Sequence, residues 1–146
     1  MKPADIRPFV PSIYEQAIAL WRSTPGVGLS EADGRAAIER FLARNPGLSF
    51  VAVDGERVVA TILCGHDGRR GLIHHLVVAP AARRRGLAVR LLRAALEALR
   101  AQGIDKRHLL VFRDNAEGRA FWRAAKATER TELAVFSVST QQAASR

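Results

Sequence analysis

The chain has 146 residues, of which 48% are apolar and 25% are charged, as expected for one globular domain with its own hydrophobic core. Its formal net charge of +9 favours anionic partners such as phosphates. No apolar run approaches the roughly 20 residues of a membrane-spanning helix, and a single cysteine excludes a disulfide between its own residues. With no signal-peptide pattern at the start, these features predict a cytoplasmic protein with no membrane partner.

Hydrophobic periodicity and turn residues predict a strand, two helices and three consecutive antiparallel strands in the first half of the chain. Ser30 and Asp33 predict a capping box at the start of the second helix, and Asp54-Gly55 predicts a hairpin turn between the first two of the three strands. The expected ranges are 6–10, 11–22, 30–45, 48–53, 57–63 and 72–78.

The second half predicts a long amphipathic helix over residues 86–102, then a strand (108–112), a helix (115–126) and a last strand (133–138). The order is β-α-α-β-β-β-α-β-α-β, and only the unit around Leu92 requires a parallel strand pair. We therefore expect an α/β (α+β) fold whose central sheet is mixed, mostly antiparallel and flanked by helices. It should form a single domain over residues 1–146, with a disordered tail over about 139–146.

The most informative segment is residues 76–88, where an apolar strand stops, a basic loop turns and a glycine opens the long helix. The first amide groups of a helix lack partners within the helix, and the helix dipole adds positive charge there. Gly86 lets the backbone approach a ligand closely because it has no side chain. The pattern predicts a phosphate cradle. The alternative is a solvated basic turn.

The segment Arg83-Arg84-Arg85-Gly86-Leu87-Ala88 resembles the acetyl-CoA signature of the GCN5-related N-acetyltransferase (GNAT) family, Arg/Gln-x-x-Gly-x-Gly/Ala. Residues 115–122, Asn-Ala-Glu-Gly-Arg-Ala-Phe-Trp, are similar to a second segment of that family, Asn-x-x-Ala-x-x-Phe-Tyr. The predicted order of strands and helices agrees with that fold, so the resemblance extends over nearly the whole chain.

The resemblance implies acetyl-CoA as the acyl donor. Its pantetheine arm would bind the backbone of the strand that precedes the loop, an amide near Val77 or Val78 would face the thioester oxygen, and the amides of residues 84–89 would hold the pyrophosphate. Asn115 would touch the arm, although an asparagine there also suits a helix cap. The expected contacts are Leu76, Val77, Val78, Arg83, Arg84, Arg85, Gly86, Leu87, Ala88, Val89 and Asn115.

Two histidines are candidates for the base that an amine acceptor requires, His74 and His75. Strict alternation along a strand would place them on opposite faces of the sheet. Some family members carry a base at the position of His74, so His74 is preferred, with a hydrogen-bonded histidine of the sheet as the alternative. Trp122 stands where the family often has a tyrosine acid, and indole cannot supply that proton.

The resemblance places the acceptor near the loop that follows the first helix, with Trp21, Gly26, Val27, Gly28 and Trp122 as candidate contacts. A plain helix connection is the alternative. The acceptor would be a small-molecule amine or the amine of a peptide or protein. Cys64, in an apolar strand, is interpreted as a buried structural residue, and the histidine spacing predicts no metal site.

The predicted activity is transfer of an acetyl group from acetyl-CoA to a primary amine by direct attack in a ternary complex. A non-catalytic acyl-CoA-binding or sensing module is the alternative, since no acid or base is certain from the residues. Nucleic acid is not an expected partner, because aromatic residues do not interleave with the basic ones. A homodimer is compatible with the family.

Overall fold

The computed structural model describes residues 3–143, which fall into two compact units. The first unit ends at Leu110 and contains the whole β-sheet, whereas the second begins at Val111 and contains two helices.

The sheet of the first unit has five strands in the order β1-β2-β3-β4-β5. Every neighbouring pair is antiparallel except β4 and β5, which are parallel and joined through a helix. The predicted mixed, mostly antiparallel sheet is therefore confirmed. The strands are β1 (Asp5–Pro8), β2 (Phe50–Asp54), β3 (Arg57–His66), β4 (Gly71–Val78) and β5 (Arg107–Leu109).

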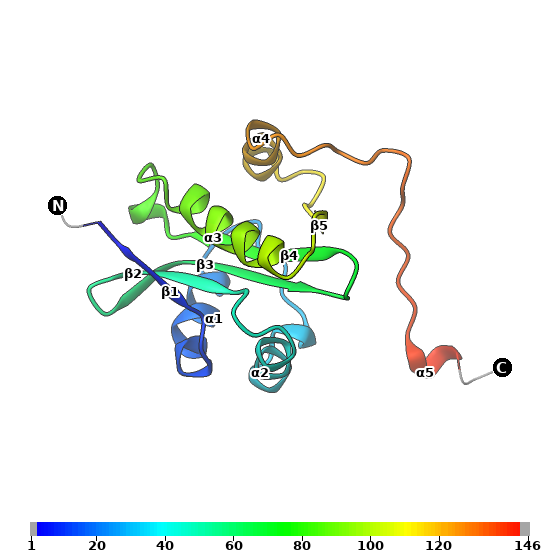
Figure 1. The fold of residues 1–146 in the computed structure, drawn as a ribbon, viewed down its shortest axis with the longest axis horizontal. Coiled ribbons are helices and arrows are strands. Elements are labelled where there is room, and N and C mark those ends of the chain that lie inside the picture. Colours follow the sequence, from blue (N-terminus) through cyan, green and yellow to red (C-terminus); the bar gives the residue numbers. More distant parts are fainter. Residues whose placement is uncertain (1–2, 144–146) are drawn as a thin grey trace. The chain divides into compact units, whose positions relative to one another are not determined.

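Three helices flank this sheet, α1 (Tyr14–Arg22), α2 (Arg35–Arg44) and α3 (Leu87–Ala101). Figure 1 shows α1 and α2 on one face of the sheet and α3 on the other. Single turns of 3-10 helix precede the helices: η1 (Pro11–Ile13), η2 (Glu31–Asp33) and η3 (Pro80–Ala82). The predicted capping box is present, but Ser30 and Asp33 cap η2, and α2 itself starts five residues later than expected.

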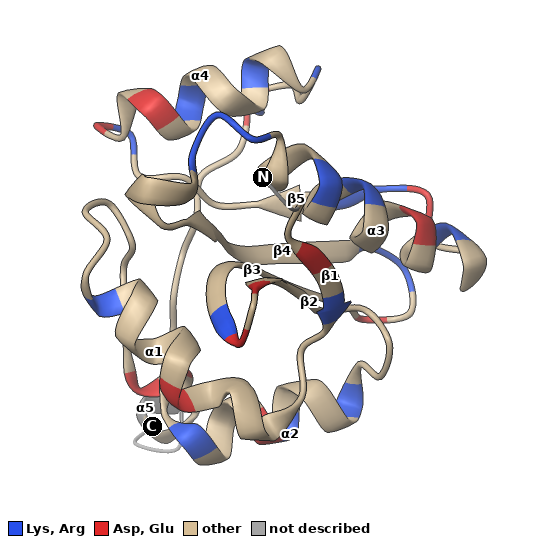
Figure 2. Cartoon of the chain, turned by 90° about the vertical axis from the view of Figure 1, so that its left-hand side faces the viewer, with Lys and Arg blue, Asp and Glu red and all other residues tan. Residues whose placement is uncertain are grey.

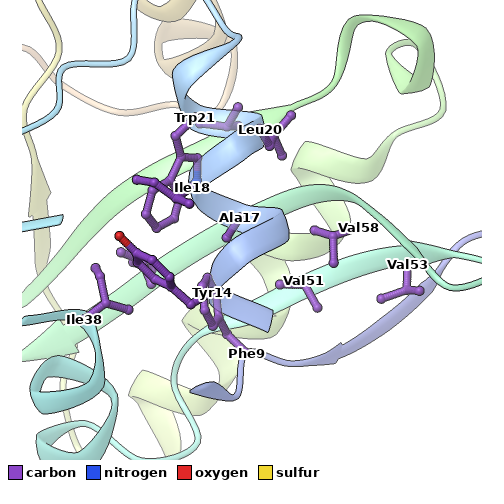
Figure 3. Close-up of a cluster of buried hydrophobic side chains, with 12 residues drawn as sticks. Phe9, Tyr14, Ala17, Ile18, Leu20, Trp21, Ile38, Val51, Val53 and Val58 are labelled. Carbon is purple, nitrogen blue, oxygen red and sulfur yellow. The ribbon is translucent and has the colours of Figure 1, made fainter. Parts of the chain in front are cut away.

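The core on the α1 face forms because apolar residues recur at helical spacing along α1. Tyr14, Ala17, Ile18 and Trp21 are buried, and they pack with strand residues such as Val51, as Figure 3 shows. Burying one large apolar side chain contributes about 1.5–3 kcal/mol. The opposite core is built by α3, whose fourth-residue stripe is buried along its length: Leu87, Leu91, Ala95 and Leu99.

A β-bulge interrupts the pairing of β3 with β4. Thr61 pairs with Val77 and Leu63 pairs with His74, so β4 holds one more residue than β3 in this interval. His75 absorbs the extra residue with φ of 45°, in the left-handed region that non-glycine residues seldom adopt. The prediction that His74 and His75 lie on opposite faces is wrong, because the bulge breaks the alternation. The His74 ring contacts Phe41 of α2 and the His75 ring contacts Trp21 of α1.

The second unit contains α4 (Ala116–Ala124) and α5 (Thr140–Ala143). The predicted strand over 133–138 does not form, because β-propensity supplies no hydrogen-bonding partner and the segment pairs with no strand among residues 3–143. Its large apolar side chains are 62–92% exposed: Leu133, Val135, Phe136 and Val138. Of the predicted tail, residues 140–143 form α5 and residues 144–146 lie outside the described range. Within that range no helix is both long and apolar enough to cross a membrane.

Candidate functional site

The loop between η3 and α3 presents free backbone amides at the start of a helix. Arg84 and Gly86 both have positive φ, 67° and 72°, and alternating backbone conformations of this kind turn successive N–H groups toward one point. The first helical bond runs from Arg90 N to Gly86 O, and no side chain caps the helix. Within the described part of the chain, the amides of Arg84 and of residues 86–89 donate no hydrogen bond.

The side chains of the three arginines in this loop have different surroundings. The Arg85 guanidinium pairs with Asp54 at 3.2 Å, and Arg83 Nε donates to the Val78 carbonyl at 3.3 Å. Arg84 is exposed and makes no ion pair within residues 3–143. In Figure 2 the loop before α3 is a continuous basic stretch. Positive charge therefore surrounds amides that already favour an anion.

The edge of β4 that leads to this loop is open. β5 pairs with β4 only over Gly71–Ile73, whereas β4 continues to Val78. The Ala79 amide donates to Val59 O at 2.8 Å. Because peptide groups alternate along an antiparallel strand, the Val78 peptide points away from β3, toward the open edge. An extended ligand can bond to such an edge in the way an added strand does.

A shallow cavity of about 180 Å³ lies between α1 and the loop that follows it. Of the predicted acceptor residues, Gly26 turns the chain with φ of 87°, Gly28 is exposed, and Val27 packs against the α1 core. Trp21 is only 1% exposed, so it supports the site from beneath rather than offering surface to a ligand. The cavity is lined by Tyr14, Ile18, Arg22, Leu29, Ser30, Glu31, Asp33 and Gly34.

The two histidines of the bulge have different surroundings. His75 Nε2 lies 2.7 Å from Asp33 Oδ1, and both side chains are largely buried. His74 is an exposed residue whose ring meets Phe41 edge-on at 5.9 Å between centroids. Desolvation by the packed side chains lowers the pKa of His74, the neighbouring His75 lowers it further, and Asp33 opposes the shift.

Asn115 and Trp122, the candidates in the second unit, both belong to α4. Asn115 Oδ1 accepts a hydrogen bond from the Gly118 amide at 3.0 Å, so Asn115 is the N-cap of that helix. The Trp122 ring packs edge-on against Phe121, with centroids 5.0 Å apart. Contacts of either residue with a cofactor or an acceptor remain predictions.

Cys64 lies in the middle of β3 and is fully buried. Burial raises the pKa of its thiol to about 12, so the reactive thiolate is scarce at neutral pH. This environment agrees with a structural role.

The sequence did not identify Asp33 or Thr61 as site residues. Sequence reasoning gives Asp33 a place in the capping box and near the acceptor loop. The box is confirmed, because the second carboxylate oxygen of Asp33 accepts from Ser30 N at 2.9 Å. Thr61 donates to His75 O and accepts from Trp21 Nε1. The three residues that meet His75 are 14–54 positions away from it along the chain, so the only available signal was an acidic residue beside the acceptor loop.

Known proteins resemble this chain both in sequence and in fold. Residues 13–125 match the sequence profile of the acetyltransferase (GNAT) family. Acetyltransferase plu1384 of Photorhabdus laumondii is 38% identical over 115 residues, which cover 76% of this chain and 77% of that protein.

Two solved structures share the fold. One is an aminoglycoside 6'-N-acetyltransferase from Acinetobacter haemolyticus, with a TM-score of 0.75 and 21% identity over 92% of this chain and 98% of the other. The other is the PaiA N-acetyltransferase of Thermoplasma acidophilum in complex with coenzyme A, with a TM-score of 0.74 and 17% identity over 85% and 89%. The profile match over most of the chain and the identity to a named acetyltransferase show that this chain belongs to the GNAT acetyltransferase family.

Proposed function

We propose that this protein is an acetyl-CoA-dependent N-acetyltransferase that transfers the acetyl group to a primary amine by direct attack in a ternary complex. Family membership supports acetyl transfer. The observation that carries the proposal is the run of amides at residues 84 and 86–89, which find no acceptor among residues 3–143 and lie in and after the basic loop at the start of α3. That arrangement suits the pyrophosphate of coenzyme A.

The open edge of β4 would take the pantetheine arm. The Val78 amide, which points away from β3, is the donor we assign to the thioester oxygen, where negative charge develops during attack. Leu76 and Val77 would line the arm, and the side chain of Arg84 would approach the phosphates. PaiA was crystallised with coenzyme A, so the fold is known to accept this ligand.

The acceptor would occupy the cavity between α1 and η2, beside the loop that contains Gly26 and Gly28. Glu31 and Asp33 line this cavity and would attract a cationic amine. A small-molecule amine and the amine of a peptide or protein both fit these features. The cytoplasmic location and the homodimer remain predictions.

Gly86→Glu tests the cradle, with Gly103→Glu as its matched control. Gly86 and Gly103 lie at opposite ends of α3, both have positive φ, and a Cβ at either position meets nothing within 4 Å. The two changes therefore introduce similar strain and the same charge. In calorimetry with acetyl-CoA we expect Gly86→Glu to weaken binding by a factor of about 10 or more, equivalent to about 1.4 kcal/mol, whereas Gly103→Glu binds like the wild type.

Equal affinities for the two variants would refute the cradle. Turnover is measured as release of free coenzyme A thiol with a polyamine, an arylalkylamine, an amino acid and a peptide with a free N-terminus. Binding of acetyl-CoA with no release for any of them would favour the sensing module over the transferase.

A further inference from the structure

We propose that His75 is the proton acceptor for the amine and that Asp33 is its positioning residue. This inference rests on the proposed transferase function and deepens it. It reverses the preference from sequence, which favoured His74. The geometry of the β4 bulge is the reason for the reversal.

The first observation is the pairing of His75 with a carboxylate. Nε2 of His75 and Oδ1 of Asp33 are 2.7 Å apart, with side chains 15% and 12% exposed. A carboxylate acceptor at Nε2 fixes the neutral tautomer that carries its proton on Nε2. The lone pair then lies on Nδ1, and no hydrogen bond occupies Nδ1 among residues 3–143. This is the arrangement of a base that a third group orients.

The second observation is that the structure holds His75 in an unfavourable backbone conformation. A left-handed conformation is unfavourable for a non-glycine residue, and His75 adopts it with φ of 45°. The buried Thr61 hydroxyl donates to His75 O at 2.8 Å, and Trp21 Nε1 donates to that same hydroxyl at 2.9 Å. The Trp21 ring also packs on the imidazole, with centroids 4.5 Å apart. Strain that is retained by several contacts is characteristic of functional sites.

His74 lacks this support. Its ring contacts Phe41 edge-on, and no hydrogen bond orients it within the described residues. A base must be positioned within hydrogen-bonding reach of the proton that it takes. Of the two histidines, His75 is the one held in a fixed orientation, because Asp33 and Trp21 contact its ring and Thr61 bonds to its backbone.

The location of the pair also suits proton transfer. Asp33 lines the acceptor cavity and also holds His75, and His75 precedes Val78 on the strand that leads to the basic loop. The charged and titratable groups around the pair are His74 on β4, Tyr14 and Arg22 on α1, and Glu31 on η2. Tyr14 donates to the Asp33 carbonyl, and the others flank His75 or line the cavity with Asp33.

Nδ1 of His75 takes one proton from the ammonium group, and the freed electron pair of the nitrogen forms the C–N bond with the thioester carbonyl carbon. The C–S bond then breaks, its electrons go to sulfur, and the second proton of the nitrogen passes to that sulfur. Coenzyme A leaves as the thiol, and His75 returns its proton to water.

Three variants test this assignment: His75→Gln, Asp33→Asn and His74→Gln. We measure kcat/KM against pH with the amine that is turned over fastest, and acetyl-CoA affinity by calorimetry. His75→Gln should lower kcat/KM by about 100-fold or more and remove the low-pH limb, while acetyl-CoA affinity is retained. Asp33→Asn should lower kcat while acetyl-CoA affinity is retained, because the His75 ring loses the carboxylate that orients it. His74→Gln should keep the limb.

His66→Gln is the matched control. His66 is the last residue of β3, away from the bulge, and its side chain bonds to Gln102. The assignment is overturned if His75→Gln keeps the wild-type limb or if His74→Gln loses it. Should His75→Gln fail to fold, Asp33→Asn decides, since a purely structural pair would lower the unfolding midpoint and leave kcat of the folded protein unchanged. Absence of turnover in the wild type would instead refute the transferase proposal itself.

Discussion

At the scale of single residues, His75 shows how one backbone angle arranges a site. Its left-handed conformation places two consecutive side chains on the same face of the sheet, which ordinary alternation forbids. Nothing in the residues around His75 indicates this angle, because histidine does not favour it. The partner carboxylate is 42 positions away. The pairing of His75 with Asp33 could therefore be found only from the three-dimensional structure.

Cys64 gives a prediction at the same scale. Burial raises the pKa of its thiol to about 12, so at pH 7.5 the thiolate needed for thiol–disulfide exchange is almost absent. We expect no labelling of the native protein by a disulfide reagent such as Ellman's reagent, and one equivalent of labelling in denaturant. Rapid labelling under native conditions would show that β3 opens far more readily than a core strand should.

At the scale of secondary structure, local sequence signals predict an element correctly where its backbone hydrogen bonds form between residues close in the chain. The stripe of α3, its closing Gly103 and the hairpin at Asp54-Gly55 are all encoded within a few residues, and all three form. The segment 133–138 is as rich in apolar and β-branched residues as β2, yet it forms no strand. A strand needs a partner, and the partner is not encoded in the segment itself.

The basic loop leads directly into α3, so the packing of α3 should support both the stability of the fold and cofactor binding. Leu91 is fully buried, whereas Leu92 is only half-buried, which makes the two alanine variants a matched pair. Leu91→Ala should lower the free energy of unfolding by about 2–5 kcal/mol because it leaves a cavity in the core. Leu92→Ala should cost distinctly less. Urea denaturation measures both, and equal losses would contradict the buried stripe.

At the scale of the whole molecule, sequence reasoning predicted a single domain over residues 1–146, and that remains a prediction. The net charge of +9 was readable from composition, but composition does not say where a polyanion binds. A general positive field and a local cradle both favour acetyl-CoA. The two explanations differ in how much acetyl-CoA affinity should fall when one positive charge is removed near the loop or far from it.

Arg84→Gln and Arg100→Gln separate the two effects, because each removes one positive charge from an exposed arginine. Arg84 belongs to the basic loop, and Arg100 lies in the last turn of α3. If a general field dominates, both variants weaken acetyl-CoA binding equally, and salt removes the difference from wild type because exposed charges are screened over about 10 Å at 0.1 M. We expect Arg84→Gln alone to weaken binding in calorimetry, by about 3-fold to 10-fold, since a charge-assisted hydrogen bond contributes more than a distant charge. If the cradle is local, the difference in affinity between Arg84→Gln and the wild type should be smaller but still measurable at 0.3 M salt.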